Sequence, residues 1–250
     1  MYTDVARNPD KEFHFPTGRA ACLFVGYPEA DLDNIPEAAL ESFAGVGCPH
    51  AAKVLTSGSV VLDVGSGSGT DSLIAGRTVG DEGRVHGLDM TPAMLQKLET
   101  NIDLARLKNV SPLAGDAEDI PLPDDSVDVI TSNGVLNLVP DKEKCFRELF
   151  RVLKPGGKIQ LADIVVGKPI SDDCRSDPEL WAECVVGASL KDLYIDQFAK
   201  AGFIDISEIR AFDYFSGSNS ENTRKIARGF DAYTVEMAMT KPGRGARVAA

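Results

Sequence analysis

The chain has 250 residues, of which 43% are hydrophobic, enough to bury the core of one large α/β domain. Its 38 acidic residues outnumber the 26 basic ones and give a formal net charge of -12, so phosphate backbones are repelled and we expect no nucleic-acid partner. No stretch approaches the roughly 20 apolar residues of a membrane span, and five irregularly spaced cysteines without a C-x-x-C pair favour free thiols, so we expect a cytoplasmic protein with no membrane partner.

The elements in chain order begin with a predicted N-terminal cover, residues 1–54, which includes an aromatic run, an acidic turn and a short helix from Pro36 to Phe43. From Ser59 onward, strands alternate with helices, a pattern typical of a doubly wound parallel sheet. The expected strands are Val60–Val64, Arg84–Leu88, Asn109–Leu113, Val127–Ile130, Lys158–Ala162, Asp205–Phe212 and Ala232–Met239. The expected helices start at Thr91-Pro92 or cover about Lys142–Leu153, Pro178–Leu190 and Lys191–Ala201, with a loop at Ser216–Asn222.

The strongest local motif is Val61-Leu-Asp-Val-Gly-Ser-Gly-Ser-Gly-Thr70, which places three glycines at alternate positions between a strand and a helix. Glycines let the backbone pass close to a ligand. The spacing is G-x-G-x-G rather than the G-x-G-x-x-G of dinucleotide enzymes, and Asp63 would repel a pyrophosphate but attract an amino group. The motif therefore favours S-adenosylmethionine over NAD(P), and an NAD(P)-dependent oxidoreductase is the disfavoured alternative from another class.

Two further acids follow the next two expected strands. Asp89 lies 20 residues after Gly69, the distance at which an acid reaches ribose hydroxyls in doubly wound folds. Asp116, in Gly115-Asp-Ala-Glu118, is placed to accept a hydrogen bond from an adenine amino group. Acids at three successive strand ends indicate one extended nucleoside ligand.

This set of motifs resembles the class I S-adenosylmethionine-dependent methyltransferases, with Leu153-Lys-Pro-Gly-Gly157 as the turn before the fifth strand. The resemblance implies a doubly wound, Rossmann-like sheet of seven strands whose last strand is antiparallel. It also implies a methyltransferase domain over residues 55–250, with an acceptor-side insertion at about 165–190. The cofactor-binding residues that it implies are Asp63, Gly65, Ser66, Gly67, Gly69, Asp89, Met90, Asp116, Ala117 and Asn133.

The turn Thr131–Asn137 would line the cavity between cofactor and acceptor in that fold. Three segments, at about residues 42–49, 132–142 and 180–188, resemble the arsenite methyltransferases, which hold trivalent arsenic with one cysteine thiolate from each segment. Cys184 matches one of these cysteines, whereas Gly134 and Val46 stand at the other two positions. Cys48 lies two residues beyond Val46 and is the candidate replacement.

Methyl transfer needs mainly alignment of the nucleophile, and a soft nucleophile needs no base. We expect Cys184, Cys48 and Asn133 to be the catalytic residues, and we expect no bound metal cofactor. Gly134, Trp181 and His14 are expected in the acceptor pocket, and Arg19 is a candidate partner of the cofactor carboxylate. The acceptor is a small molecule: trivalent arsenic, or alternatively a carbon or oxygen atom of an organic metabolite or quinone.

The remaining cysteines favour structural roles. Cys145 falls within an amphipathic helix and Cys22 lies beside Leu23-Phe24, so both are expected in the core. Cys174 is expected in an exposed loop. The sequence does not indicate an oligomeric state.

Overall fold

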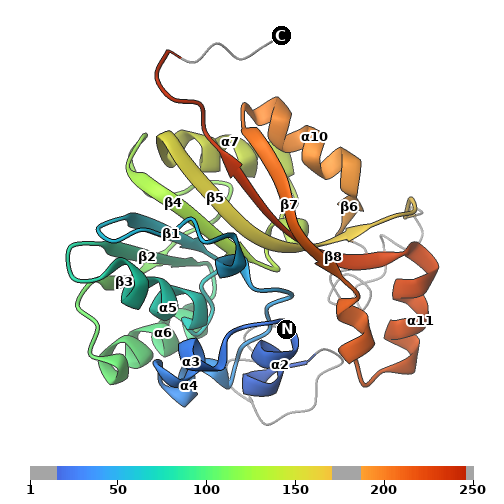
Figure 1. Ribbon diagram of the computed structural model, residues 1–250, viewed down its shortest axis with the longest axis horizontal. Helices are drawn as coiled ribbons and strands as arrows, with labels where there is room; N and C mark the ends of the chain where they lie inside the picture. Colours follow the sequence, from blue (N-terminus) through green and yellow to red (C-terminus); the bar gives the residue numbers. More distant parts are fainter. Residues whose placement is uncertain (1–15, 171–186, 246–250) are drawn as a thin grey trace.

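One mixed sheet organises the chain, as the computed structural model shows for residues 16–170 and 187–245 (Figure 1). Its main path has the strand order β3-β2-β1-β4-β5-β8-β7, and the short strand β6 pairs with β5. The strands β1 to β5 pair in parallel, whereas β8 is antiparallel to both β5 and β7. The strands are β1 (Val60–Val64), β2 (Arg84–Asp89), β3 (Val110–Ala114), β4 (Val127–Asn133), β5 (Leu153–Val166), β6 (Ser189–Leu190), β7 (Ile204–Phe212) and β8 (Ala232–Thr240). The predicted doubly wound sheet with an antiparallel last strand is confirmed.

Helices cover both faces of this sheet and divide the buried side chains into two cores. One core contains Leu73 of α5, Leu98 of α6 and the buried residues of the cover. The other contains Phe146 of α7 and Phe198 of α10, whose rings stack with centroids 4.0 Å apart. Successive residues of β1 enter different cores, because neighbouring side chains of a strand point to opposite faces: Val61 lies in the first core, and Leu62 and Val64 lie in the second. The helices are α5 (Thr70–Val79), α6 (Pro92–Ala105), α7 (Lys142–Val152), α10 (Lys191–Ala201) and α11 (Glu221–Phe230).

The N-terminal cover lies beside the glycine-rich loop and β8 (Figure 1). It contains α2 (Gly18–Phe24), α3 (Glu29–Asp33), α4 (Glu37–Leu40) and the 3-10 turn η1 (Pro49–Ala52). Ser68 and Thr70 both donate their hydroxyl hydrogen bonds to the Ala39 carbonyl, and Thr234 on β8 donates to the Val46 carbonyl. The cover is therefore bonded to the loop and to the sheet, although a domain boundary at residue 54 stays a prediction.

Some predicted boundaries are wrong. Ser189–Leu190 form β6 instead of ending a helix, because their backbone pairs with β5, and the rest of the helix expected from Pro178 lies outside the described residues. No helix is predicted at Glu221–Phe230, yet α11 forms there, and the Ser220 side chain caps it by accepting a hydrogen bond from the Thr223 backbone. Strand β5 starts at Leu153, directly after α7, and includes the Pro-Gly-Gly segment, so this segment lies within the strand and not before it.

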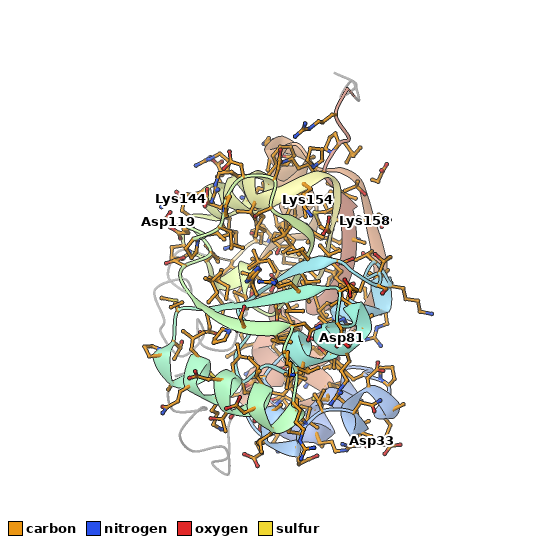
Figure 2. The ribbon with its side chains drawn as sticks, turned by 90° about the vertical axis from the view of Figure 1, so that its left-hand side faces the viewer. Asp33, Asp81, Asp119, Lys144, Lys154 and Lys158 are labelled. Atoms are coloured by element: carbon orange, nitrogen blue, oxygen red, sulfur yellow. The ribbon has the colours of Figure 1, made fainter. Side chains whose placement is uncertain are left out.

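Many charged side chains lie on the surface of the fold. Figure 2 shows the labelled side chains Asp33, Asp81, Asp119, Lys144, Lys154 and Lys158, none of which is buried. None of the described helices combines the length and the apolar character that crossing a membrane requires.

An ion pair attaches the cover to the C-terminal hairpin. Arg210 on β7 donates to both carboxylate oxygens of Glu236 on β8, which is only 1% exposed, and also to the Val25 carbonyl at the end of α2. The Arg210 guanidinium lies 4.4 Å from the centre of the Phe212 ring. One arginine thus compensates a buried carboxylate and fixes the end of a cover helix.

Replacing this arginine tests the attachment. We expect Arg210→Ala to lower the free energy of unfolding by about 2 kcal/mol, because Glu236 would stay buried without its cation. The loss is smaller than for a fully buried pair because Arg210 is partly exposed. Urea denaturation measures the change. The control is Lys191→Ala, which removes an exposed pair with Glu208 of the same strand and should cost less than about 1 kcal/mol. Equal losses in the two variants would contradict the account.

Candidate cofactor and acceptor site

A cavity of about 560 Å³ opens at the carboxyl ends of β1, β2 and β4, where ligands bind in open α/β sheets. The glycine-rich loop forms one wall, and residues 42–45 of the cover form another. The turns after β3 and β4 complete it. Predicted residues that line it are Gly65, Ser66, Gly67, Asp89, Met90, Asp116, Ala117, Asn133 and Gly134.

The glycine-rich loop has a backbone that side chains would not allow. Gly65 and Gly69 have φ of 74° and 103°, in the left-handed region. A Cβ at Gly65 would lie 2.2 Å from Val135 Cγ2, and one at Gly69 would lie 2.5 Å from Leu98 Cδ1. The loop therefore packs its backbone against the turn after β4 and against α6, and it presents open backbone to the cavity at Gly67, which fits an extended nucleoside ligand.

Two of the predicted acids line the cavity at the ends of β2 and β3. Asp89 Oδ2 accepts a hydrogen bond from the Gly67 backbone at 2.9 Å, and its Oδ1 accepts one from the Thr91 backbone at 2.8 Å. The Asp89 carboxylate thus ties the glycine loop to the start of α6. Asp116 accepts from the Glu118 backbone at 2.9 Å and lines the cavity beside Ala117. Contacts of these acids with ribose and adenine stay predictions.

Asp63 occupies a different place from the other acids. It is 2% exposed, accepts a hydrogen bond from the Ser72 hydroxyl and is not among the described residues that line the cavity. Burial, and to a lesser extent the nearby charge of Asp71, raises the pKa of the Asp63 carboxyl to about 7. A carboxyl that retains its proton near neutral pH is a poor partner for an ammonium group.

Asn133, at the end of β4, holds the cover against the sheet. Its Oδ1 accepts hydrogen bonds from the backbone of Val46 at 2.8 Å and of Gly47 at 3.2 Å. Its Nδ2 lies within hydrogen-bonding distance of the Gly47 carbonyl, the Tyr27 hydroxyl and Asp71 Oδ2. Both ends of the amide are fully used, so the side chain positions the cover; the catalytic role expected from the sequence stays a prediction.

Three residues that the sequence did not single out lie at or next to this amide: Tyr27 and Asp71 contact it, and His50 lies beside Asp71. Asp71, in the first turn of α5, accepts a hydrogen bond from the Tyr27 hydroxyl. His50 Nε2 lies 3.0 Å from Asp71 Oδ1, and His50 Nδ1 lies 3.2 Å from Gln160 Nε2. Only Asp71 carried a local signal, because it is the second residue of the helix after the glycine-rich loop. Tyr27 and His50 are brought in by the cover.

The described thiols are buried away from the cavity. Cys48 is 3% exposed, and burial followed by the charge of Asp71 raises the pKa of its thiol to about 12. Cys22 and Cys145 are buried in the two cores, as predicted, and burial raises the pKa of each thiol. None of these three cysteines is among the described residues that line the cavity. The predicted residues Cys184, Trp181 and His14, and Cys174, lie outside the described residues.

The two substituted positions of the resemblance are in contact. Gly134 has φ of 70°, and a Cβ there would lie 3.2 Å from Val46 Cγ1. Gly134 lines the cavity with Val135. Side chains at positions 46 and 134 therefore share one space at the end of β4.

Arg19 does not reach the cavity lining. Its guanidinium forms ion pairs with Asp33 and Glu37, which belong to the cover itself. These acids and Glu29 raise the pKa of Arg19. A role toward the cofactor carboxylate stays a prediction without support from this arrangement.

The strand order, the glycine-rich loop and the acids at the ends of β2 and β3 are features of an S-adenosylmethionine-dependent methyltransferase domain. A family described as "Methyltransferase domain" matches residues 55–202, and the chain belongs to this family. The glycine cradle and the acidic wall fit its cofactor, whose methyl group is electrophilic when bound.

Among known proteins, the chain is similar to the arsenite methyltransferase of Halobacterium salinarum, with 39% identity over 69% of this chain and 45% of that protein. It is also similar to the demethylmenaquinone methyltransferase of Listeria welshimeri, with 40% identity over 42% of this chain and 45% of that protein. The crystal structure of an arsenic(III) S-adenosylmethionine methyltransferase from Chlamydomonas reinhardtii superposes with a TM-score of 0.74, at 31% identity over 87% of this chain and 74% of that chain. The chain spans about half the length of the curated relatives it matches.

The raised pKa of Asp63 predicts a pH dependence of stability. The group binds its proton more tightly in the folded state than its ordinary value of 3.8 implies, so stability falls as the pH rises from about 4 to about 7, by at most about 1.4 kcal/mol per pH unit. We expect Asp63→Asn to remove this component, so that the variant gains stability relative to the parent over that range. Urea denaturation of the cofactor-free proteins at pH 5, 6, 7 and 8 measures it, and parallel stability curves would contradict it.

Proposed function

We propose that this methyltransferase acts on a small organic molecule, at an electron-rich carbon or oxygen. The observation that supports this most is the contact of Val46 with Gly134. In the resemblance to arsenite methyltransferases, cysteines occupy both positions. Here a branched hydrocarbon and a hydrogen atom replace them, so two of three expected thiolates are missing from one place.

The available replacement thiol gives little compensation. Cys48 is buried within the cover, its backbone donates to Glu236, and its raised pKa disfavours the thiolate that binds arsenic. The cavity wall near Gly134 instead offers apolar side chains. Those at the acceptor end are Phe43, Val135, Leu138 and Val139.

The chemistry of the wall also favours an activated organic acceptor. In the described part of the chain, no histidine, lysine or arginine lines the cavity. The titratable side chains that line it are the carboxylates of Asp71, Asp89, Asp116 and Glu118, each of which already accepts a hydrogen bond from the protein. An acceptor whose nucleophile needs strong general-base assistance would therefore find few free bases there. An electron-rich ring such as a hydroquinone needs less, and the similarity to a demethylmenaquinone methyltransferase agrees with this class.

Arsenite is the second candidate acceptor, favoured by the similarity to an arsenite methyltransferase over 69% of the chain. In this case Cys184, helped by a small-molecule thiol such as glutathione, would hold the arsenic.

A direct comparison distinguishes the two candidates. The purified protein is incubated with S-adenosylmethionine and either arsenite plus glutathione or a set of small naphthohydroquinones and catechols, and mass spectrometry identifies methylated products and S-adenosylhomocysteine. We expect methylated organic product and no methylated arsenic. Methylated arsenic that disappears in Cys184→Ser would overturn the proposal in favour of arsenite.

The contact between positions 46 and 134 also predicts a gain of function. We expect the double substitution Val46→Cys and Gly134→Cys to lower the dissociation constant for arsenite at least about tenfold, because two adjacent thiols chelate one arsenic atom. Fluorescence or calorimetric titration measures it, with Val46→Cys alone as the matched control. A side chain at φ of 70° costs about 1 kcal/mol, so folding is checked by thermal denaturation. Equal arsenite affinity in the single and double variants would contradict the shared site.

A further inference from the structure

We propose that the Asp71 carboxylate receives the ammonium group of the cofactor's methionine moiety, and that Tyr27, Asn133 and His50 act as positioning residues for it. The proposal concerns the cofactor and is independent of the methyl acceptor. It replaces the sequence-based expectation that Asp63 takes this role.

Asp71 is a nearly buried acid at the cavity wall. Its side chain is 9% exposed, and it lines the cavity together with Asn133 and Gly65. In the described part of the chain, no lysine or arginine pairs with it, and the one basic side chain near it is His50. Because buried carboxylates are normally paired with a cation, this position favours a cationic ligand group.

The carboxylate is held in place from three sides. The Tyr27 hydroxyl donates to Oδ1, His50 Nε2 lies 3.0 Å from Oδ1, and Asn133 Nδ2 lies 3.2 Å from Oδ2. These groups belong to the cover, to η1 and to β4, so the orientation of Asp71 depends on the assembled site. Oδ2 has one neighbour of this kind and retains capacity for a further donor, since a carboxylate oxygen accepts about two hydrogen bonds.

The order of the strands indicates which end of the cofactor would lie over each part of the cavity. Asp89 ends β2 and Asp116 follows β3, at the side where the acid after the second strand meets ribose in doubly wound folds. Asp71 and Asn133 lie instead over β1 and β4, on the opposite side of the glycine-rich loop. With the adenosine over β2 and β3, the amino-acid end of the cofactor reaches Asp71.

Asp63 is less suited to the same role. It is 2% exposed, lies outside the described lining of the cavity and already accepts from Ser72. Its raised pKa, close to 7, further weakens it as a partner for a cation near neutral pH. The two acids thus divide between a buried structural position and a ligand-facing one.

Calorimetric titration with two ligands tests the assignment. The ligands are S-adenosylhomocysteine and its analogue in which hydrogen replaces the amino group. We expect Asp71→Asn to weaken S-adenosylhomocysteine about 10- to 100-fold, the range of a charge-assisted hydrogen bond, and to change the affinity of the analogue less than about threefold. Equal losses for both ligands would mean that Asp71 acts only on the structure, and would overturn the proposal.

Two further variants complete the test. In Asp63→Asn we expect the ratio of the two affinities to stay within about threefold of the parent ratio. A selective loss of affinity for S-adenosylhomocysteine in this variant would mean that Asp63, and not Asp71, binds the ammonium group. Tyr27→Phe keeps the ring and removes the donor to Asp71, so we expect it to reduce the preference for S-adenosylhomocysteine over the analogue, but by less than Asp71→Asn does. Thermal denaturation checks that Asp71→Asn is folded. If it is not, Tyr27→Phe alone tests the proposal, and a ratio of the two affinities equal to that of the parent would overturn it.

Discussion

The side-chain amide of Asn133 is the interaction on which the site depends. It stands at the end of β4, where the parallel sheet delivers residues to the ligand, and it binds the backbone of the cover at Val46 and Gly47. The same amide reaches Tyr27 and Asp71. One side chain therefore joins the cover, the glycine-rich loop's helix and the strand end, so the cover and the cofactor cavity form together.

This constraint couples positions 46 and 134. Val46 is held by Asn133 directly opposite Gly134, so substituting one position alters the space available to the other. Two cysteines there would make a chelating pair, whereas a valine facing a glycine makes an apolar recess.

The sequence predicted most of the fold and the cofactor wall because those features are local. The period of the strands, the three glycines and the acids Asp89 and Asp116 depend on residues near one another in the chain. The contacts of Tyr27 and His50 with Asp71 depend on how the cover folds back across 44 and 21 positions, which no local pattern indicates. The sequence likewise singled out Asp63, whereas the structure buries Asp63 and places Asp71 in the lining of the cavity, a difference that depends on tertiary packing.

Hydrogen exchange of the cover tests the central claim most directly. The measurement compares amide exchange of residues 43–52 in the cofactor-free parent, in Asn133→Ala and in Asn109→Ala, which removes an asparagine bonded to the Gly76 and Gly80 carbonyls of α5 and its C-cap. The account predicts faster exchange of this segment in Asn133→Ala alone, with the central amides of β1 and β5 unchanged. Unchanged exchange of residues 43–52 in Asn133→Ala would contradict it, and would mean that the cover holds its place without this amide.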